Sequence, residues 1–245
     1  MNIHTISNNP GPSNNGSWSE ALQDWWSRCP LFTRFIIYTS VSIYILSWIF
    51  SEIVIFFCNI PFLTLNQFHL WTIFTTAFVN LHLLTLLFAL WSWVDISVKL
   101  ENRSGTMHFI LNFFVLNALI QVIYLTIVIF LSYIYYPFYL MPSAGLWPLI
   151  MSLITIECLR NPEADYFFFV SFKAKYYPWI LLLFFMVFNQ FVIQVDVLSG
   201  ILFGYISFYY LERFIEIPLT TALSLENSIL FSWMKSFSSK SFYNI

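Results

Sequence analysis

The chain has 245 residues, of which 59% are hydrophobic and only 9% are charged. A soluble domain has about 25% charged residues, so this chain has too few charges to cover a globule in water, and a polytopic membrane protein is expected. The net charge of −2 gives no basis for binding nucleic acid.

The N-terminal 24 residues are predicted to form a tail outside the membrane domain. Residues 1–17 are rich in Asn, Ser, Pro and Gly, a composition typical of disorder. The following stretch, Trp18 to Arg28, contains Trp25 and Trp26 and favours a short helix on the bilayer surface. No basic region followed by a cleavage motif is present, so we expect no removed signal peptide.

Six apolar segments follow, and a helix needs about 20 residues to cross the bilayer core. We expect residues 25–215 to form an all-α, six-transmembrane-helix bundle, followed by a cytosolic tail at 216–245. The six segments run from about Leu31 to Phe50, Leu81 to Leu100, His108 to Phe130, Ser143 to Leu159, Tyr177 to Gln194 and Val195 to Leu211.

The first loop, Ser51 to Asn80, is apolar but interrupted. It contains Pro61, a few polar residues and a single charge, Glu52. We predict a partly membrane-embedded loop with short helices, because irregular backbone is tolerated at membrane depth only where protein covers it.

The basic residues predict the orientation. None of the ten Lys and Arg residues lies in the loops after segments one, three or five. Since short cytosolic loops carry the excess of Lys and Arg, both termini are expected in the cytosol. The ten are Arg28, Arg34, Lys99, Arg103, Arg160, Lys173, Lys175, Arg213, Lys235 and Lys240.

Three acidic residues lie in or beside the segments. Asp95 and Glu157 are near predicted cytosolic ends, where snorkelling or pairing with Lys99 or Arg160 explains them. Asp196 has no cation nearby, so it either lies at the lumenal surface or accepts backbone N–H bonds at the start of segment six.

Small residues predict where two segments meet. Ser143-Ala144-Gly145 is expected to open segment four, and Gly200 and Gly204 lie one turn apart in segment six. Such positions let helices approach closely, so we expect segments four and six to pack together.

Six motifs follow one another along the chain. They are Phe68-His69-Leu70-Trp71-Thr72, Leu81-His82-Leu83-Leu84, Leu100-Glu101-Asn102-Arg103-Ser104-Gly105-Thr106, Ser143-Ala144-Gly145, Ala174-Lys175-Tyr176-Tyr177-Pro178-Trp179 and Gly200-Ile201-Leu202-Phe203-Gly204. Their order and spacing resemble the rhomboid superfamily over about residues 25–215. The stretch Ala174 to Trp179 is similar to endomembrane rhomboids, and Phe208 to Glu212 resembles derlins.

The resemblance implies a serine nucleophile at the start of segment four, a histidine base in segment six, and a histidine and an asparagine in segment two that hold the oxyanion. In this chain the serine position is Ala144, next to Ser143, and the base position is Val197. His82 matches the oxyanion histidine, but its partner position is Leu86.

The resemblance therefore implies a rhomboid-like pseudoprotease of the endoplasmic reticulum or Golgi, in which four glycines keep a structural role. Its expected partners are the lipid bilayer, transmembrane client proteins in quality control or trafficking, and cytosolic quality-control factors, with no cofactor. The glycines are Gly105, Gly145, Gly200 and Gly204.

Two alternatives remain. The first is an active intramembrane serine endopeptidase with a displaced dyad, which needs Ser143 with His82 or another base. The second is a transporter, for which a polar site near the midplane is expected. Asn117, Gln121, Asn189 and Gln190 are its candidate polar residues, whereas Cys29, Cys58 and Cys158 are expected to be packing residues without a disulfide or metal site.

Overall fold

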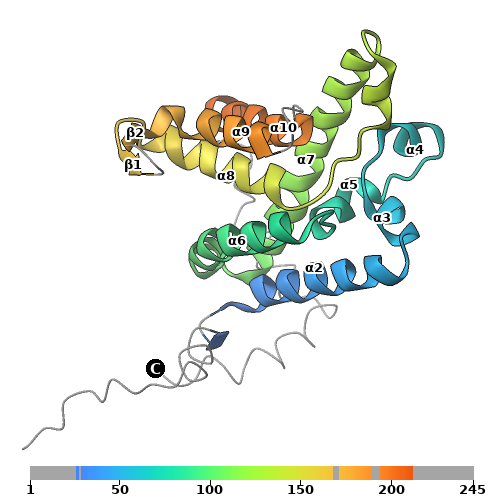
Figure 1. Ribbon diagram of the computed structural model, residues 1–245. Coiled ribbons are helices and arrows are strands. Elements are labelled where there is room, and N and C mark those ends of the chain that lie inside the picture. The colour runs from blue at the N-terminus through green and yellow to red at the C-terminus, as the bar shows by residue number, and fades with distance from the viewer. Residues whose placement is uncertain (1–25, 28, 168–170, 189–193, 212–245) are drawn as a thin grey trace, which may run out of the picture.

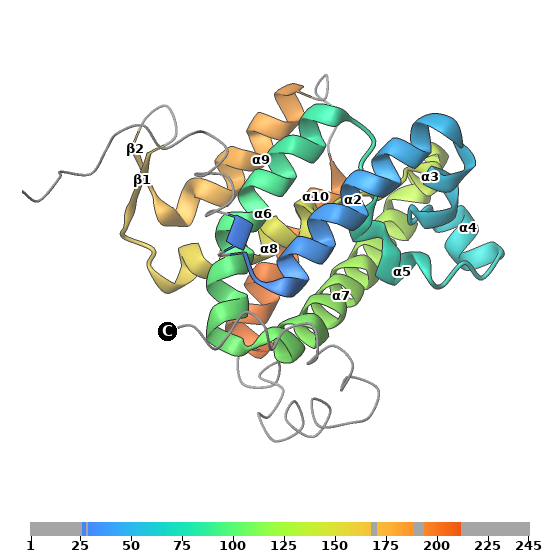
Figure 2. The same ribbon diagram turned by 90° about the horizontal axis from the view of Figure 1, so that it is seen from below.

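The computed structural model describes residues 26–27, 29–167, 171–188 and 194–211. Over these residues the chain folds as a bundle of helices with one short β hairpin (Figures 1 and 2). Both predicted tails, 1–24 and 216–245, lie outside the described residues, as do Asn189 and Gln190.

Three of the described helices are long and apolar enough to cross a membrane. They lie close to the first three predicted segments, which confirms those segments as helices, although α7 extends further at both ends than expected. The helices are α2 (Leu31–Ile49), α6 (Leu83–Ser104) and α7 (Thr106–Ser132).

The remaining three segments form shorter helices. The fourth begins later than predicted, and the prediction that Ser143-Ala144-Gly145 opens it is wrong. Gly145 has a φ of 98°, outside the helical region, and Ser143 lies in a β-bridge with Asn59. The helices are α8 (Trp147–Arg160), α9 (Tyr177–Phe188) and α10 (Val195–Ile206), the last continuing as the π-helical turn η4 (Ser207–Leu211).

The first loop contains short helices, as predicted. Pro61 occupies the first turn of one of them, where its missing N–H has no intrahelical partner to lose. The short elements of the first loop are α3 (Glu52–Phe57), α4 (Pro61–Asn66), α5 (Thr72–Thr75) and η1 (Thr76–Phe78). Two more short helices lie later in the chain, η2 (Tyr136–Leu140) and η3 (Ala174–Tyr176).

The main core gathers around α6 and α7. Trp93 of α6 is fully buried and packs against Phe109 and Phe113 of α7, with ring centroids 5.9 and 5.5 Å apart. Phe32 of α2 meets the same Phe113 edge-on at 5.3 Å. Offset and edge-on geometries are those that aromatic pairs prefer, so this cluster fixes the first three long helices against one another.

Glu101, near the end of α6, is buried and joins α2 to α6. Its carboxylate accepts hydrogen bonds from the backbone N–H groups of Phe32 and Thr33, both at 3.0 Å, and from the hydroxyls of Thr33 and Thr106, both at 2.9 Å. Pro30 provides no side-chain cap for α2. The carboxylate of a neighbouring helix therefore satisfies N–H groups that a helix start leaves unpaired.

The two helices with small residues pack closely, as the spacing of Gly200 and Gly204 predicts. A methyl group at Gly200 would lie 2.0 Å from the carbonyl oxygen of Pro148, and one at Gly204 would lie 2.9 Å from that of Ser152. Because neither distance leaves room for a side chain, the backbones of α8 and α10 can approach only with glycine at both positions.

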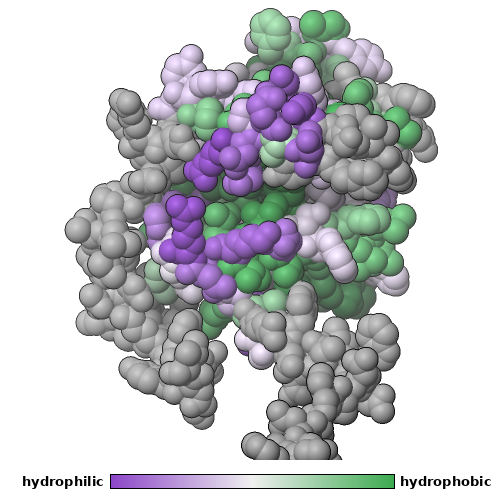
Figure 3. All heavy atoms as spheres, turned by 90° about the vertical axis from the view of Figure 1, so that its left-hand side faces the viewer, coloured by the Kyte–Doolittle hydropathy of each residue, from purple (hydrophilic) through white to green (hydrophobic). Residues whose placement is uncertain are grey.

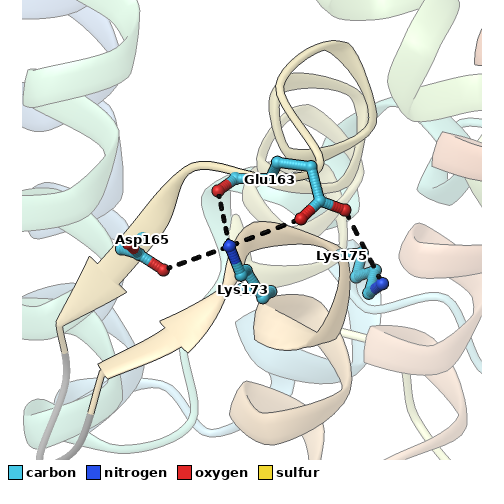
Figure 4. Close-up of polar contacts among 4 residues, drawn as sticks. All are labelled: Glu163, Asp165, Lys173 and Lys175. Carbon is cyan, nitrogen blue, oxygen red and sulfur yellow. Dashed lines mark hydrogen bonds and ion pairs between the residues drawn. The ribbon is translucent and has the colours of Figure 1, made fainter.

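Hydrophilic side chains gather at the end of the molecule that carries the β hairpin, β1 (Asp165–Phe167) and β2 (Ser171–Lys173) (Figure 3). There Lys173 lies 3.3 Å from the carboxylate of Glu163 and 3.8 Å from that of Asp165, and Lys175 lies 3.8 Å from Glu163 (Figure 4). These exposed pairs contribute little to stability.

The pairing expected for Asp95 is confirmed. Its carboxylate lies 3.0 Å from the ammonium group of Lys99, one helical turn further along α6, and both side chains are largely exposed. This arrangement needs no ligand, so Asp95 is accounted for by an exposed helical ion pair.

Candidate functional site

The stretch that precedes α8 is held in place by backbone contacts with the first loop. Ser143 and Asn59 exchange N–H···O bonds of 2.9 and 3.2 Å, and the Thr76 hydroxyl donates to the carbonyl of Ser143 at 2.7 Å. The N–H of Gly145 donates to the carbonyl of Thr76 at 2.9 Å. Two loops far apart in the sequence therefore form one ordered unit. We call residues 143–146, which lie directly before α8, the mouth of α8.

The hydroxyl of Ser143 is buried inside this unit. The residue is 0% exposed, and its Oγ accepts a hydrogen bond of 3.1 Å from the side-chain amide of Gln121 in α7. The carbonyl oxygen of the same amide accepts from Asn59 at 2.8 Å. A serine needs a base to become a nucleophile, and an amide nitrogen that donates to the hydroxyl cannot take its proton.

Ala144, the position expected for the nucleophile, is half-buried and contacts Asp196 through its backbone. The Asp196 carboxylate accepts a hydrogen bond of 2.8 Å from the N–H of Val197, and it lies close enough to the N–H of Ala144 to interact with it electrostatically. Of the two alternatives for Asp196, the backbone-bonding role at the start of α10 is therefore observed. The carboxylate also ties the mouth of α8 to α10.

Val197, the position expected for the base, is 1% exposed. Its side chain packs in a small apolar cluster with Met151 of α8, Leu181 and Leu182 of α9, and Ile201. This cluster is distinct from the main core around α6 and α7, and Val197 contributes packing to it.

His82 and Leu86, the positions expected for the oxyanion donors, begin α6. His82 is exposed, and its side chain makes no capping hydrogen bond to the helix. Leu86 is 2% exposed. Among the described residues no hydrogen bond joins His82 to Ser143, so the structure does not assemble the pair that a displaced dyad needs.

Trp147 bridges α6 and α9 at the start of α8. Its indole N–H donates to the carbonyl of Thr85 in α6 at 3.2 Å. Its ring meets Phe185 of α9 edge-on, with centroids 4.4 Å apart. This half-buried side chain therefore stands between the two helices on either side of the mouth of α8.

The other candidates have structural contacts. The ring of His69 stacks on Trp71 at 4.5 Å in the first loop. Cys29 is buried and free, and burial raises the pKa of its thiol, which makes it a poor nucleophile. Across residues 26–27, 29–167, 171–188 and 194–211, no three His, Cys, Asp or Glu side chains are grouped so that they could hold a metal ion.

Sequence reasoning missed the polar network beneath Ser143. From the sequence, Gln121 and Asn117 are only candidate polar residues of a transporter. In the structure Gln121 bonds Ser143 and Asn59, and Asn117 donates to the carbonyls of Ile73 and Phe74 at 2.8 and 3.3 Å. The signal that predicts such contacts is the presence of uncharged amides in a largely apolar helix, since such groups in membranes find protein partners.

The sequence matches the Der1-like family over residues 29–224. It is also similar to rhomboid-like protein 15 of Arabidopsis thaliana, with 27% identity over 226 residues that cover 87% of this chain and 54% of that protein. The chain thus spans about half the length of this curated relative.

Proposed function

The chain belongs to the Der1-like family of rhomboid-like integral membrane proteins, and from this premise we propose that it is a proteolytically inactive member that binds transmembrane segments of client proteins in quality control or trafficking. The observation that carries the proposal is the contact between Asp196 and Ala144. This contact places the Asp196 carboxylate, a hydrogen-bond acceptor, where proteolysis needs a hydrogen-bond donor for the oxyanion.

Proteolysis at this site would need a nucleophile, a base and a donor for the oxyanion. Ala144 and Val197 supply neither of the first two. In serine proteases the backbone N–H of the nucleophile helps to hold the oxyanion, but here the Ala144 N–H faces the carboxylate of Asp196. A carboxylate beside this N–H also repels developing negative charge rather than stabilising it.

The test of inactivity uses a serine-reactive fluorophosphonate probe on the purified protein. We expect no labelling, because the hydroxyl of Ser143 is buried and accepts a hydrogen bond from the side-chain amide of Gln121. Labelling that disappears in Ser143→Ala and persists in Ser132→Ala, an equally conservative change at the end of α7, would overturn the proposal.

Client binding is supported by the region between α6 and α9. There the half-buried side chain of Trp147 connects the two helices. It makes one hydrogen bond, to the carbonyl of Thr85 inside α6. A client helix could replace this side chain without separating two tightly packed backbones, in contrast to the contact between α8 and α10.

The short α8 adds to this argument. Its 14 residues span about 21 Å, whereas the hydrocarbon core is about 30 Å thick. A short span thins the bilayer locally, and we propose that this lowers the cost of admitting client segments that carry polar residues.

The test of client binding is site-specific photocrosslinking in cells. A photoreactive residue replaces Phe88, which is 63% exposed and lies one turn after Thr85 in α6. The matched control replaces Val122, 50% exposed on α7. We expect membrane-protein adducts from the first position only. Equal adducts from both, or none from either, would contradict the proposal.

The arrangement in the membrane is part of the same proposal. We propose six spans within residues 25–215, with the tails 1–24 and 216–245 in the cytosol of an endoplasmic reticulum or Golgi membrane. The hydrophilic face around the hairpin supports this orientation (Figure 3), since Lys173 and Lys175 lie there (Figure 4). Cytosolic quality-control factors are the proposed partners of this face and of the tails.

A further inference from the structure

A groove opens between α2 and α6, away from the candidate site. The two helices run antiparallel, side by side (Figures 1 and 2). Glu101 joins them at one end, and the buried residues of α2 all lie in its first half, between Phe32 and Ser40. Beyond Ser40 the helices leave a groove of about 360 Å³.

The groove is lined by one apolar stripe from each helix. Within each stripe the residues recur three and four positions apart, which places them on a single helix face. The α2 stripe comprises Val41, Tyr44, Ile45 and Trp48, and the α6 stripe comprises Leu83, Leu86, Leu87 and Leu90. Two such faces would normally close on each other, so their separation here leaves room for a third apolar body.

We propose that this groove binds one acyl chain of a membrane lipid. The lining residues include no Gly, Ala or Ser, the small residues at which the backbone of another helix could approach closely. A hydrocarbon chain is slim enough to enter. Inside a membrane the driving force is packing, because an unfilled space forfeits dispersion contacts along its walls.

The position of the groove suits a lipid. Its lining comes from the last part of α2 and the first part of α6. One end of the groove therefore lies at the end of α2 and the start of α6, beside Trp48 and Leu83. Trp48 is 75% exposed, as is typical of tryptophans at the membrane interface. The open side continues into the exposed apolar surface of α6 at Phe88 and Trp91, the kind of surface that faces the bilayer.

The test uses the full chain in nanodiscs of phosphatidylcholine with a diazirine on the acyl chain. After illumination, adducts are mapped by mass spectrometry. We expect them to concentrate on the groove stripes and to be lost in Leu87→Trp, which fills the groove. Leu84→Trp adds the same ring at a position that is 65% exposed and outside the lining, and it should leave the adducts unchanged.

Three results would overturn the assignment. The first is groove adducts that survive Leu87→Trp, and the second is adducts equally dense at Val122 on α7, which indicate annular lipid alone. If a photoreactive residue at Ile45 captures a membrane protein instead of lipid, the groove is a protein contact and the assignment also fails. None of these results depends on client capture at Phe88, so the two proposals stand or fall separately.

Discussion

Replacing Glu101 by glutamine tests whether one buried carboxylate holds α2 onto α6. The change keeps the size of the side chain but leaves one acceptor oxygen instead of two. In the structure each oxygen accepts one backbone N–H, from Phe32 or Thr33, and one threonine hydroxyl. The new NH₂ group must therefore face a donor.

The magnitude follows from these contacts. A threonine hydroxyl can rotate to accept from the new NH₂ group, so the unavoidable loss is one backbone N–H left unpaired, at about 1–3 kcal/mol. Removing the negative charge from the start of α2 adds about 0.3–1 kcal/mol. A total of about 1–4 kcal/mol corresponds to a fall in Tm of about 2–16 °C for a chain of this size.

The assay is thermal unfolding of the purified protein in detergent, followed by tryptophan fluorescence. Glu157→Gln is the matched control, because it makes the same chemical change at an exposed position of α8. We expect its Tm to stay within about 1 °C of the parent, as for surface substitutions in general. If Glu101→Gln behaves like this control, the carboxylate does not hold the two helices together.

Three further predictions concern packing, the α6–α9 region and topology. Gly200→Ala should lower Tm, although the same change in a free helix gains about 1 kcal/mol, because its methyl would lie 2.0 Å from the Pro148 carbonyl; a higher Tm would contradict this. Trp147→Ala should broaden the spin-label distance distribution between α6 and α9, with Trp147→Phe intermediate, and an unchanged distribution would rule out the bridge. The sequence carries two Asn-x-Ser glycosylation patterns, Asn15-Gly16-Ser17 and Asn102-Arg103-Ser104. A glycosylation acceptor inserted at 134–142 should be modified while these two are not, and modification of either natural site would refute the six-span topology.

The long helices could be predicted because an uninterrupted apolar run is a local signal. For α2 the expected and observed ends agree closely, from Leu31 to Phe50 against Leu31 to Ile49. The close contact of α8 with α10 was also predictable, since the spacing of Gly200 and Gly204 is itself the signal. These features depend on residues that are neighbours in the sequence or on one helix face.

The parts that could not be predicted depend on contacts between distant segments. Hydropathy extends the fourth segment back to Ser143, but the bridge to Asn59 and the positive φ of Gly145 hold this stretch out of the helix. Glu101 looks like an ordinary charged residue at a helix end. Its burial follows only from the start of α2, where Pro30 offers no side-chain cap.

The geometry also separates two properties of the candidate site that the family resemblance joins: its catalytic groups and the packing of α8 on α10. Exchanging a hydroxyl for hydrogen at position 144 removes a nucleophile but leaves the backbone N–H that faces Asp196. Adding a single methyl at Gly200 would instead drive α10 into the backbone of α8. Catalytic groups can therefore be lost one at a time with little change in packing, whereas the contact between these helices cannot change without moving the loop that carries Ala144. A protein that keeps this contact without the chemistry retains the shape of the mouth of α8, and it is this shape that we propose the client segments recognise.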